Sequence, residues 1–198
     1  MDAREPADQS LAVAIIAGLG NPGRKYENTR HNIGFEVIER LGKAVGAAEK
    51  QEKFDAYHGK YQYGGRPLVL LRPLTYMNDS GRSIAAAIKF YKTPVDRLLL
   101  ICDDLALPLG KLRMRRSGSS GGQKGLQSAI ERIGSSEFAR LRIGIDCTPP
   151  GWETADYVLS RFTPSERPKI DAAVETAVDA ALCWLADGPE TAMNRFNR

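Results

Sequence analysis

The sequence contains few of the residues that cross-link chains or bind metals. Its 198 residues include two histidines and three cysteines, the latter at positions 102, 147 and 183. An odd number of scattered cysteines gives neither a disulfide framework nor the spacing of a metal site. We therefore expect buried, reduced thiols in a protein of the cytoplasm, where disulfides are rare.

Long apolar runs are also absent. No run approaches the roughly 18 residues of a membrane-spanning helix, so the sequence predicts no such helix and no membrane partner. The first ten residues, MDAREPADQS, are charged and lack the apolar stretch of a secretory signal. We expect residues 1–10 to form a flexible tail and residues 11–198 to form one domain.

Positive charge is concentrated in one segment, although the net charge of the chain is only +4. Residues 111–142 contain eight lysines and arginines against two glutamates. These charges surround the loop SGSSGG at residues 117–122, which could present backbone N–H groups to an anion. Such a local basic field attracts phosphate groups, whereas a solvated surface is the simpler alternative.

Hydrophobic patterns typical of strands and helices follow one another along the chain. Apolar residues at helical spacing predict helices from Ile33 onward and over residues 84–91, 126–133, 154–162 and 163–187. The last of these could begin with a capping box at Thr163 and Glu166 or with Ser165 as its N-cap. Short apolar or alternating runs predict strands over residues 11–17, 54–63, 67–71, 97–102, 111–115 and 138–145. This order predicts a single α/β domain with a mixed, mostly parallel twisted sheet and helices on both faces.

The first expected strand is followed by the glycine-rich loop GLGNPG at residues 18–23. Its three glycines have the spacing of the fingerprint that binds dinucleotide cofactors. However, Pro22 and the polar residues 24–30 delay the next helix by roughly ten residues, so a pyrophosphate would have no helix N-terminus to bind. The loop therefore disfavours a nucleotide-cofactor enzyme, and a simple tight turn is the alternative.

The two histidines lie in different contexts. His31 follows the glycine-rich loop, and histidine is the residue whose ordinary pKa best suits proton transfer near neutrality. His58 lies among aromatic residues in an expected strand, which favours a structural role. Asp103 and Asp104 directly follow another expected buried strand and could bind a metal or orient a base. Because no further metal ligand lies close to them in the sequence, we favour the orienting role and expect no metal.

Three loops that follow expected strands, at residues 18–32, 72–79 and 103–104, can converge at one edge of the sheet. They would then bring together Asn21, His31, Asn78 and Asp103. A neutral histidine held by a carboxylate can deprotonate water, and asparagine amides can stabilise an oxyanion. These residues therefore permit hydrolysis of an acyl bond beside a basic strip that attracts phosphate.

Six motifs together resemble the bacterial peptidyl-tRNA hydrolase family, from about Val13 to Phe196. They are GLGNPGRKYENTRHNIGF at 18–35, RPLTYMNDSG at 72–81, DDLALPLGKLRMR at 103–115, GSSGGQKGL at 118–126, FARLRIGI at 138–145 and MNRF at 193–196. The resemblance implies a monomeric α/β enzyme that cleaves the ester between a peptide, or an N-blocked aminoacyl group, and the 3′-terminal ribose of tRNA. Its partner would be the acceptor stem and 3′ CCA end of peptidyl-tRNA from stalled or aborted translation. No metal or cofactor is implied.

The same resemblance assigns roles to individual residues. His31 matches the catalytic base of the family, and Asp103 matches the acid that orients it. The residues that match the substrate-binding set are Asn21 beside the ribose and ester, Met77 and Asn78 on the peptide side, and Tyr26. Lys124 stands where this set has an asparagine. Arg115 and Arg142 occupy the positions of a clamp for tRNA phosphate, and guanidinium groups suit phosphate well.

One motif departs from the family pattern. Where the family commonly has Gly-Gly-His-Asn-Gly, residues 121–125 of this chain are Gly-Gly-Gln-Lys-Gly. Lys124 can still donate a hydrogen bond to an oxyanion, and Gln123 can replace a hydrogen-bonding histidine but cannot titrate. The departure leaves open a second hypothesis, a non-catalytic RNA-binding protein on the same fold.

Overall fold

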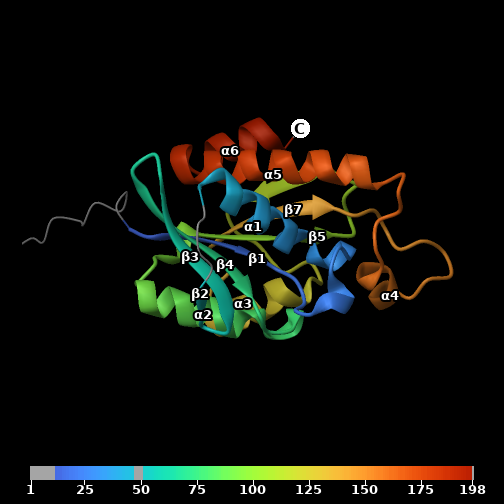
Figure 1. The fold of residues 1–198 in the computed structure, drawn as a ribbon, viewed down its shortest axis with the longest axis horizontal. Helices are drawn as coiled ribbons and strands as arrows, with labels where there is room; N and C mark the ends of the chain where they lie inside the picture. Colours follow the sequence, from blue (N-terminus) through green and yellow to red (C-terminus); the bar gives the residue numbers. More distant parts are fainter. Residues whose placement is uncertain (1–11, 47–50, 198) are drawn as a thin grey trace, which may run out of the picture.

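A mixed sheet forms the centre of the molecule (Figure 1). The computed structural model describes residues 12–46 and 51–197, and their strands form one seven-stranded sheet in the order β2-β3-β4-β1-β5-β7-β6. The strands are β1 (Ala14–Gly18), β2 (Gln51–Lys53), β3 (Ala56–Tyr63), β4 (Arg66–Pro73), β5 (Leu98–Asp104), β6 (Leu112–Arg115) and β7 (Ala139–Gly144). The tail expected over residues 1–10 lies outside the described residues.

The middle of the sheet is parallel and its edges are antiparallel. β1 pairs in parallel with β4 and β5, and β5 pairs in parallel with β7. The pairs β2–β3, β3–β4 and β6–β7 are antiparallel, so all strands of this sheet except β3 and β6 point in one direction. β1 and β5 are buried along their whole length, as central parallel strands covered on both faces should be. The expected mixed α/β sheet is confirmed.

Helices cover both faces of the sheet (Figure 1). α1 (Ile33–Ala44), α5 (Arg167–Asp187) and α6 (Pro189–Phe196) contribute to the core on one face, and α2 (Ser80–Tyr91) and α3 (Lys124–Ile133) to the core on the other. Strand side chains alternate between the two cores; Ile16 faces the first and Ala17 the second. The short α4 (Thr154–Leu159) lies past the end of β7, at the carboxyl edge of the central strands.

The connection between β1 and α1 holds two short 3₁₀ helices, η2 (Arg24–Tyr26) and η3 (Arg30–Asn32). α1 then begins in direct contact with the sheet, because a Cβ atom on Gly34 would lie 2.5 Å from the carbonyl oxygen of Ile101 in β5. Only glycine permits this approach. The η3 turn is thereby held at the carboxyl end of β5.

The strand β2 carries no sequence signal, because its three residues are exposed and lack apolar alternation. It is a strand because it pairs with β3. His58 lies in β3, as expected, and is buried with its Nδ1 atom 3.1 Å from the carbonyl oxygen of Gln51 in β2. Its ring lies 5.5 Å from that of Phe54, which agrees with a structural role among aromatic residues.

The helices α4 and α5 are shorter than the sequence pattern predicts. The helix expected over residues 154–162 ends at Leu159, and the helix expected over residues 163–187 begins at Arg167. Thr163 and Glu166 still exchange the hydrogen bonds of a capping box: the N–H of Thr163 donates to Glu166 Oε2 at 2.7 Å, and the N–H of Glu166 donates to Thr163 Oγ1 at 3.3 Å.

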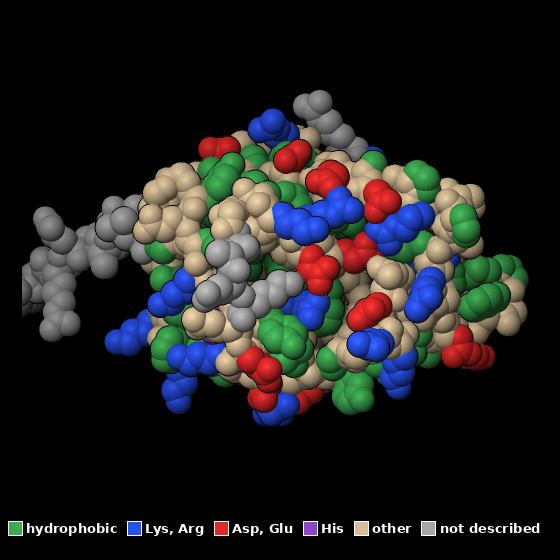
Figure 2. Space-filling view, viewed as in Figure 1, with side chains coloured by type: hydrophobic (Ala, Val, Ile, Leu, Met, Phe, Trp, Pro, Cys, Tyr) green, Lys and Arg blue, Asp and Glu red, His purple; other side chains and the backbone are tan. Residues whose placement is uncertain are grey.

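Charged side chains of both signs are interspersed over α1 and α5 on the face seen in Figure 2. Arg167 pairs there with Glu36 and Asp171, and Arg40 pairs with Glu175. The surface over α1 and α5 therefore lacks the one-sided basic field expected for residues 111–142. None of the helices in the described ranges is long and apolar enough to cross a membrane.

Candidate active site

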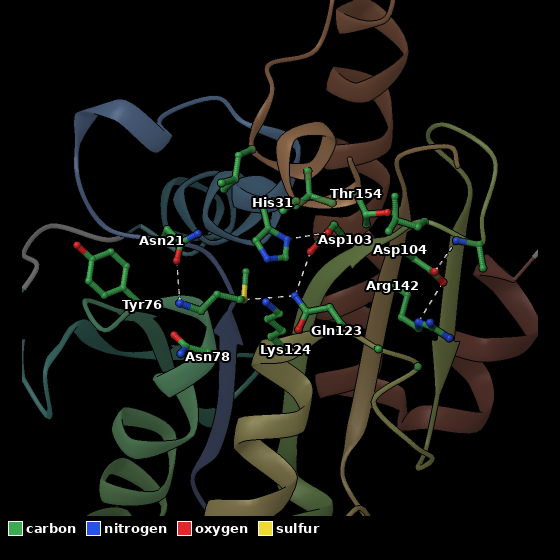
Figure 3. A pocket seen from close by; sticks show the side chains of 18 residues that line it. Asn21, His31, Tyr76, Asn78, Asp103, Asp104, Gln123, Lys124, Arg142 and Thr154 are labelled. Atoms are coloured by element: carbon green, nitrogen blue, oxygen red, sulfur yellow. Dashed lines mark hydrogen bonds and ion pairs between the residues drawn. The ribbon is translucent and has the colours of Figure 1, made fainter. Parts of the chain in front are cut away.

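His31 and Asp103 form a hydrogen-bonded pair at the carboxyl end of β5 (Figure 3). The Nδ1 atom of His31 lies 2.8 Å from Oδ2 of Asp103, and the two side chains are 12% and 4% exposed. An ionised carboxylate only accepts hydrogen bonds, so Nδ1 carries the hydrogen and Nε2 of the neutral ring keeps its lone pair. The pair has the arrangement of a base oriented by an acid.

Gln123 holds the other oxygen of the same carboxylate. Its Nε2 atom donates to Asp103 Oδ1 at 3.0 Å, and its Oε1 atom accepts from the backbone N–H of Leu126 at 2.8 Å. The second bond caps the N-terminus of α3, so a flip of the amide would break both bonds. A chain of hydrogen bonds therefore runs from the start of α3 through Gln123 and Asp103 to His31.

Asn21 is fixed by two neighbouring segments. Its backbone N–H donates to Oδ1 of Asn32 at 2.8 Å, and Nδ2 of Asn32 donates back to the carbonyl of Asn21 at 2.9 Å. Its side-chain Oδ1 accepts from the backbone N–H of Met77 at 2.8 Å. Figure 3 shows the amide nitrogen of Asn21 on the side toward His31. Asn21 can therefore donate a hydrogen bond to a group bound beside His31.

A cleft of about 770 Å³ opens beside these residues. Seven of the nine site residues expected from the sequence line it: Asn21, His31, Met77, Asn78, Asp103, Lys124 and Arg142. Thr154, Ala155, Val158 and Leu159 of α4 form part of its lining, which we call the α4 wall. The structure thus brings together residues from the β1–α1 loop, β5, β7, α3 and the 3₁₀ helix η4 (Met77–Asp79).

Tyr26 and Arg115 lie outside the cleft lining. Tyr26 packs edge to face on Tyr76, with ring centroids 6.4 Å apart, and the 58% exposed Tyr76 lines the cleft. Arg115 is exposed on the edge strand β6 and pairs across the sheet with Arg140. Because Arg142 lies two residues beyond Arg140 on β7, Arg115 and Arg142 are diagonal neighbours on one sheet face.

Arg142 meets a buried acid at the rim of the cleft. Its Nε atom forms an ion pair with Oδ2 of Asp104 at 3.0 Å. The other oxygen of this carboxylate, Oδ1, accepts from the backbone N–H of Ala106 at 2.9 Å. The side chain of Arg142 is 24% exposed and forms part of the cleft lining. Arg142 is therefore held in place and still available to an anion.

Arg140 is a buried cation beside this rim. It is 2% exposed and donates to the backbone carbonyls of Gly118 and Ser119, the latter at 3.0 Å, and of Ser136 and Phe138 at 2.9 and 3.3 Å. Burial lowers the pKa of its guanidinium. Its hydrogen bonds hold the loop at residues 117–122 against β7.

Sequence reasoning missed the supporting roles of Gln123 and Arg140. The available signal for Gln123 is its position directly before α3, where a side-chain acceptor caps a helix. Arg140 carries no such signal, because it is one of several arginines in an alternating basic segment. Arg140 is buried because β7 packs against the loop at residues 117–122, which no pattern in the sequence indicates.

Within residues 12–46 and 51–197, no three His, Cys, Asp or Glu side chains are grouped as metal ligands would be. Cys102 adjoins the acids but is completely buried, and its burial raises the pKa of the thiol. A buried thiol of this kind is unreactive. Asp103 instead contacts His31, and Asp104 contacts Arg142.

Comparison with known proteins gives consistent matches along the chain. The family model described as Peptidyl-tRNA hydrolase matches residues 15–198. Proteins named peptidyl-tRNA hydrolase from Chlorobaculum parvum and Chlorobium phaeobacteroides are 47% and 45% identical, over 93% of this chain and 97% of each relative. The crystal structure of peptidyl-tRNA hydrolase from Acinetobacter baumannii has a TM-score of 0.88 and 32% identity, covering 94% of this chain and 95% of that one. A nucleosidase from Campylobacter jejuni, 12% identical with a TM-score of 0.51, shares the fold alone.

Proposed function

The chain belongs to the peptidyl-tRNA hydrolase family and is an enzyme of that kind, and from this premise we propose that His31 is the base that activates water for ester cleavage. The observation that carries the proposal is the 2.8 Å hydrogen bond from Nδ1 of His31 to Asp103. It leaves Nε2 as the basic nitrogen of a residue that lines the cleft. Gln123, which replaces the usual histidine of the family, supports this role because its side-chain amide orients the carboxylate of Asp103.

In the proposed reaction, Nε2 of His31 takes a proton from water while the water oxygen attacks the ester carbonyl carbon. The carbonyl becomes a tetrahedral oxyanion, to which Nδ2 of Asn21 donates a hydrogen bond. The bond to the ribose oxygen then breaks, and the proton on Nε2 passes to that oxygen. The products are a peptide carboxylic acid, which gives its proton to solvent at neutral pH, and tRNA with a free 3′-terminal ribose hydroxyl.

The two ends of the substrate have separate places in this proposal. The peptide lies along η4, where Asn78 is exposed. Its side-chain amide makes no hydrogen bond to the described residues, so it can bind the peptide backbone. The tRNA phosphates bind Arg142 and its diagonal neighbour Arg115, and Lys124 adds positive charge at the start of α3. Tyr26 acts through Tyr76, whose ring it supports.

We also propose that the enzyme acts as a monomer in the cytoplasm. The proposed catalytic pair supports this, because His31 and Asp103 bond each other directly within one chain. The three free cysteines, two of them buried, suit a reducing compartment.

The test is release of the acyl group from a purified N-acetyl-aminoacyl-tRNA, with and without EDTA. We expect equal rates in both conditions, and we expect Asp103→Asn to lower turnover by roughly 10²-fold or more because the amide no longer fixes the tautomer of His31. Asp96→Asn, at an exposed aspartate in the 3₁₀ helix η5 (Val95–Arg97), is the matched control. Loss of activity with EDTA would contradict activation of water by His31 alone and would indicate a metal-dependent reaction. Binding of tRNA without any release of the acyl group would favour the RNA-binding hypothesis.

A further inference from the structure

A buried arginine joins the turn that carries His31 to α4. Arg30 precedes His31 in η3 and is 4% exposed. Its guanidinium carbon lies 4.4 Å from the centroid of the Tyr157 ring and 4.8 Å from that of Phe162. Tyr157 belongs to α4 and Phe162 follows it, so two aromatic rings hold the cation.

Polar contacts hold the same side chain. Nη2 of Arg30 donates to both carboxylate oxygens of Glu166, at 3.0 and 2.8 Å, and Nε donates to Oγ of Ser160 at 3.2 Å. The backbone N–H of Arg30 donates to the carbonyl of Ser160 at 2.9 Å. Burial alone would raise the pKa of Glu166, but hydrogen bonds from Arg30 and Thr163 outweigh it and hold the pKa below its ordinary value. The carboxylate is therefore charged at neutral pH.

α4 depends on such contacts for its position. A helix of six residues is too short to be stable alone. A further polar anchor is the hydroxyl of Tyr157, which donates to the carbonyl of Ile145 after β7 at 2.6 Å. Tyr157 thus fixes α4 from within the core, while four other residues of the helix line the cleft as the α4 wall. A displaced Arg30 would disturb both this wall and the backbone next to His31.

We propose that Arg30 is a positioning residue for ester cleavage, which locks α4 onto the η3 turn and so fixes the α4 wall and His31 relative to each other. The inference rests on the proposed role of His31 as the base. Arg30 itself touches no substrate. A lysine cannot take its place, because only a planar guanidinium can lie against two rings while donating to Glu166 and Ser160.

The test compares Arg30→Lys with Arg40→Lys, the same change in an exposed ion pair on α1. Five quantities are measured on each protein: the melting temperature, the Kd for deacylated tRNA, kcat and KM for N-acetyl-aminoacyl-tRNA, and the imidazole NMR signals. The spectrum is simple because the chain has only two histidines, His31 and His58.

In Arg30→Lys we expect kcat to fall on the order of tenfold to a hundredfold, because a small displacement of a base is costly to catalysis. The Kd for tRNA should stay within about twofold, since the proposed phosphate contacts at Arg115 and Arg142 are unchanged. The His31 signal should move and the His58 signal should not. A folded Arg30→Lys protein with wild-type kcat and an unmoved His31 signal overturns the proposal.

Phe162→Leu and Glu166→Gln give the same test if Arg30→Lys does not fold, because each removes one partner and keeps the guanidinium. Lower kcat with a shifted His31 signal in both supports the lock, and wild-type values in both overturn it. His31→Asn separates this inference from the proposed function. Wild-type turnover in His31→Asn would show that His31 is not the base. The His31 signal in Arg30→Lys would still report whether Arg30 positions the η3 turn.

Discussion

At the scale of single residues, the carboxylate of Asp103 decides which nitrogen of His31 is basic. One of its oxygens accepts from Nδ1 of His31, and the other accepts from Nε2 of Gln123. A carboxylate held between two donors orients the imidazole without taking its proton. In this chain the second donor is an amide, so the supporting group has no ionisation of its own.

Gln123→Glu tests this support with almost no change of shape. The glutamate can still accept from the N–H of Leu126 and cap α3, but it loses the donor to Asp103 and places a second carboxylate against it. Two adjacent carboxylates disfavour joint ionisation. We expect kcat at pH 7 to fall by roughly tenfold or more and the acid limb of the pH–rate profile to move to higher pH.

Gln127→Glu serves as the control for that experiment, because Gln127 is an exposed residue of the same helix and bonds Glu131. It should leave kcat unchanged. If Gln123→Glu keeps the wild-type rate and pH profile, the bond from Gln123 to Asp103 has no part in catalysis.

Sequence reasoning places His31 and Asp103 beside each other because the segments that carry them both follow strands expected to end at one edge of the sheet. His31 also has only one competitor among the histidines. The chain has two histidines, and His58 lies in a strand context. The same reasoning could not find the bond from Gln123 to Asp103, because it depends on how close α3 approaches the end of β5. Nor could it find the lock at Arg30, whose partners lie more than a hundred residues away.

At the scale of elements, α4 ends where the chain meets η3 and the residue before it. The helical pattern continues past Leu159, but the carbonyl of Ser160 accepts from the N–H of Arg30, and Arg161 forms an antiparallel bridge with Thr29. These bonds draw the chain out of the helix. Patterns along the chain predict that a helix is present, but long-range bonds decide where it ends.

The start of α5 gives a prediction for acid stability. The folded-state pKa of Glu166 lies below its ordinary value of 4.5, so the charged carboxylate stabilises the fold above that pH. This stabilisation is lost as the pH falls through the folded-state pKa. We expect the melting temperature of the wild type to drop between about pH 5 and pH 3. Glu166→Gln should melt lower at pH 7 and should lose less on acidification.

Glu131→Gln, at an exposed carboxylate on α3, is the reference for this measurement. It should follow the wild type across the pH range. Parallel melting curves for Glu166→Gln and the wild type would show that the contact between Arg30 and Glu166 does not contribute to stability.

At the scale of the whole molecule, the sheet places its chemistry at one edge and its basic strip beside it. Apart from β2, the order of strands and helices was predictable from sequence. The convergence of three loops was also predictable, because the carboxyl ends of parallel strands share an edge. The pairing of β6 with β7 was not predictable from sequence. It sets Arg115 opposite Arg140 and hence diagonal to Arg142. Alternation along each strand gives the face of an arginine but not its neighbour across the sheet.

This arrangement predicts how salt affects the enzyme. Each phosphate contact that is lost should reduce the slope of log KM against log salt by about one. We expect Arg115→Gln and Arg142→Gln each to raise KM at low salt and to flatten that slope, with kcat nearly unchanged. Arg40→Gln, on the mixed-charge surface of α1, should keep the wild-type slope. Unchanged slopes in both clamp variants would place the phosphate contacts elsewhere.

The most direct test of the role of His31 is single-turnover cleavage of N-acetyl-aminoacyl-tRNA by His31→Asn, with His58→Asn as the matched control. Asparagine can keep a donor near the position of Nδ1, so the bond to Asp103 is retained and only the base at Nε2 is lost. We predict a rate lower by about 10²-fold or more, with tRNA affinity retained and His58→Asn cleaving at the wild-type rate. A His31→Asn enzyme that cleaves at the wild-type rate would contradict the assignment of His31 as the base.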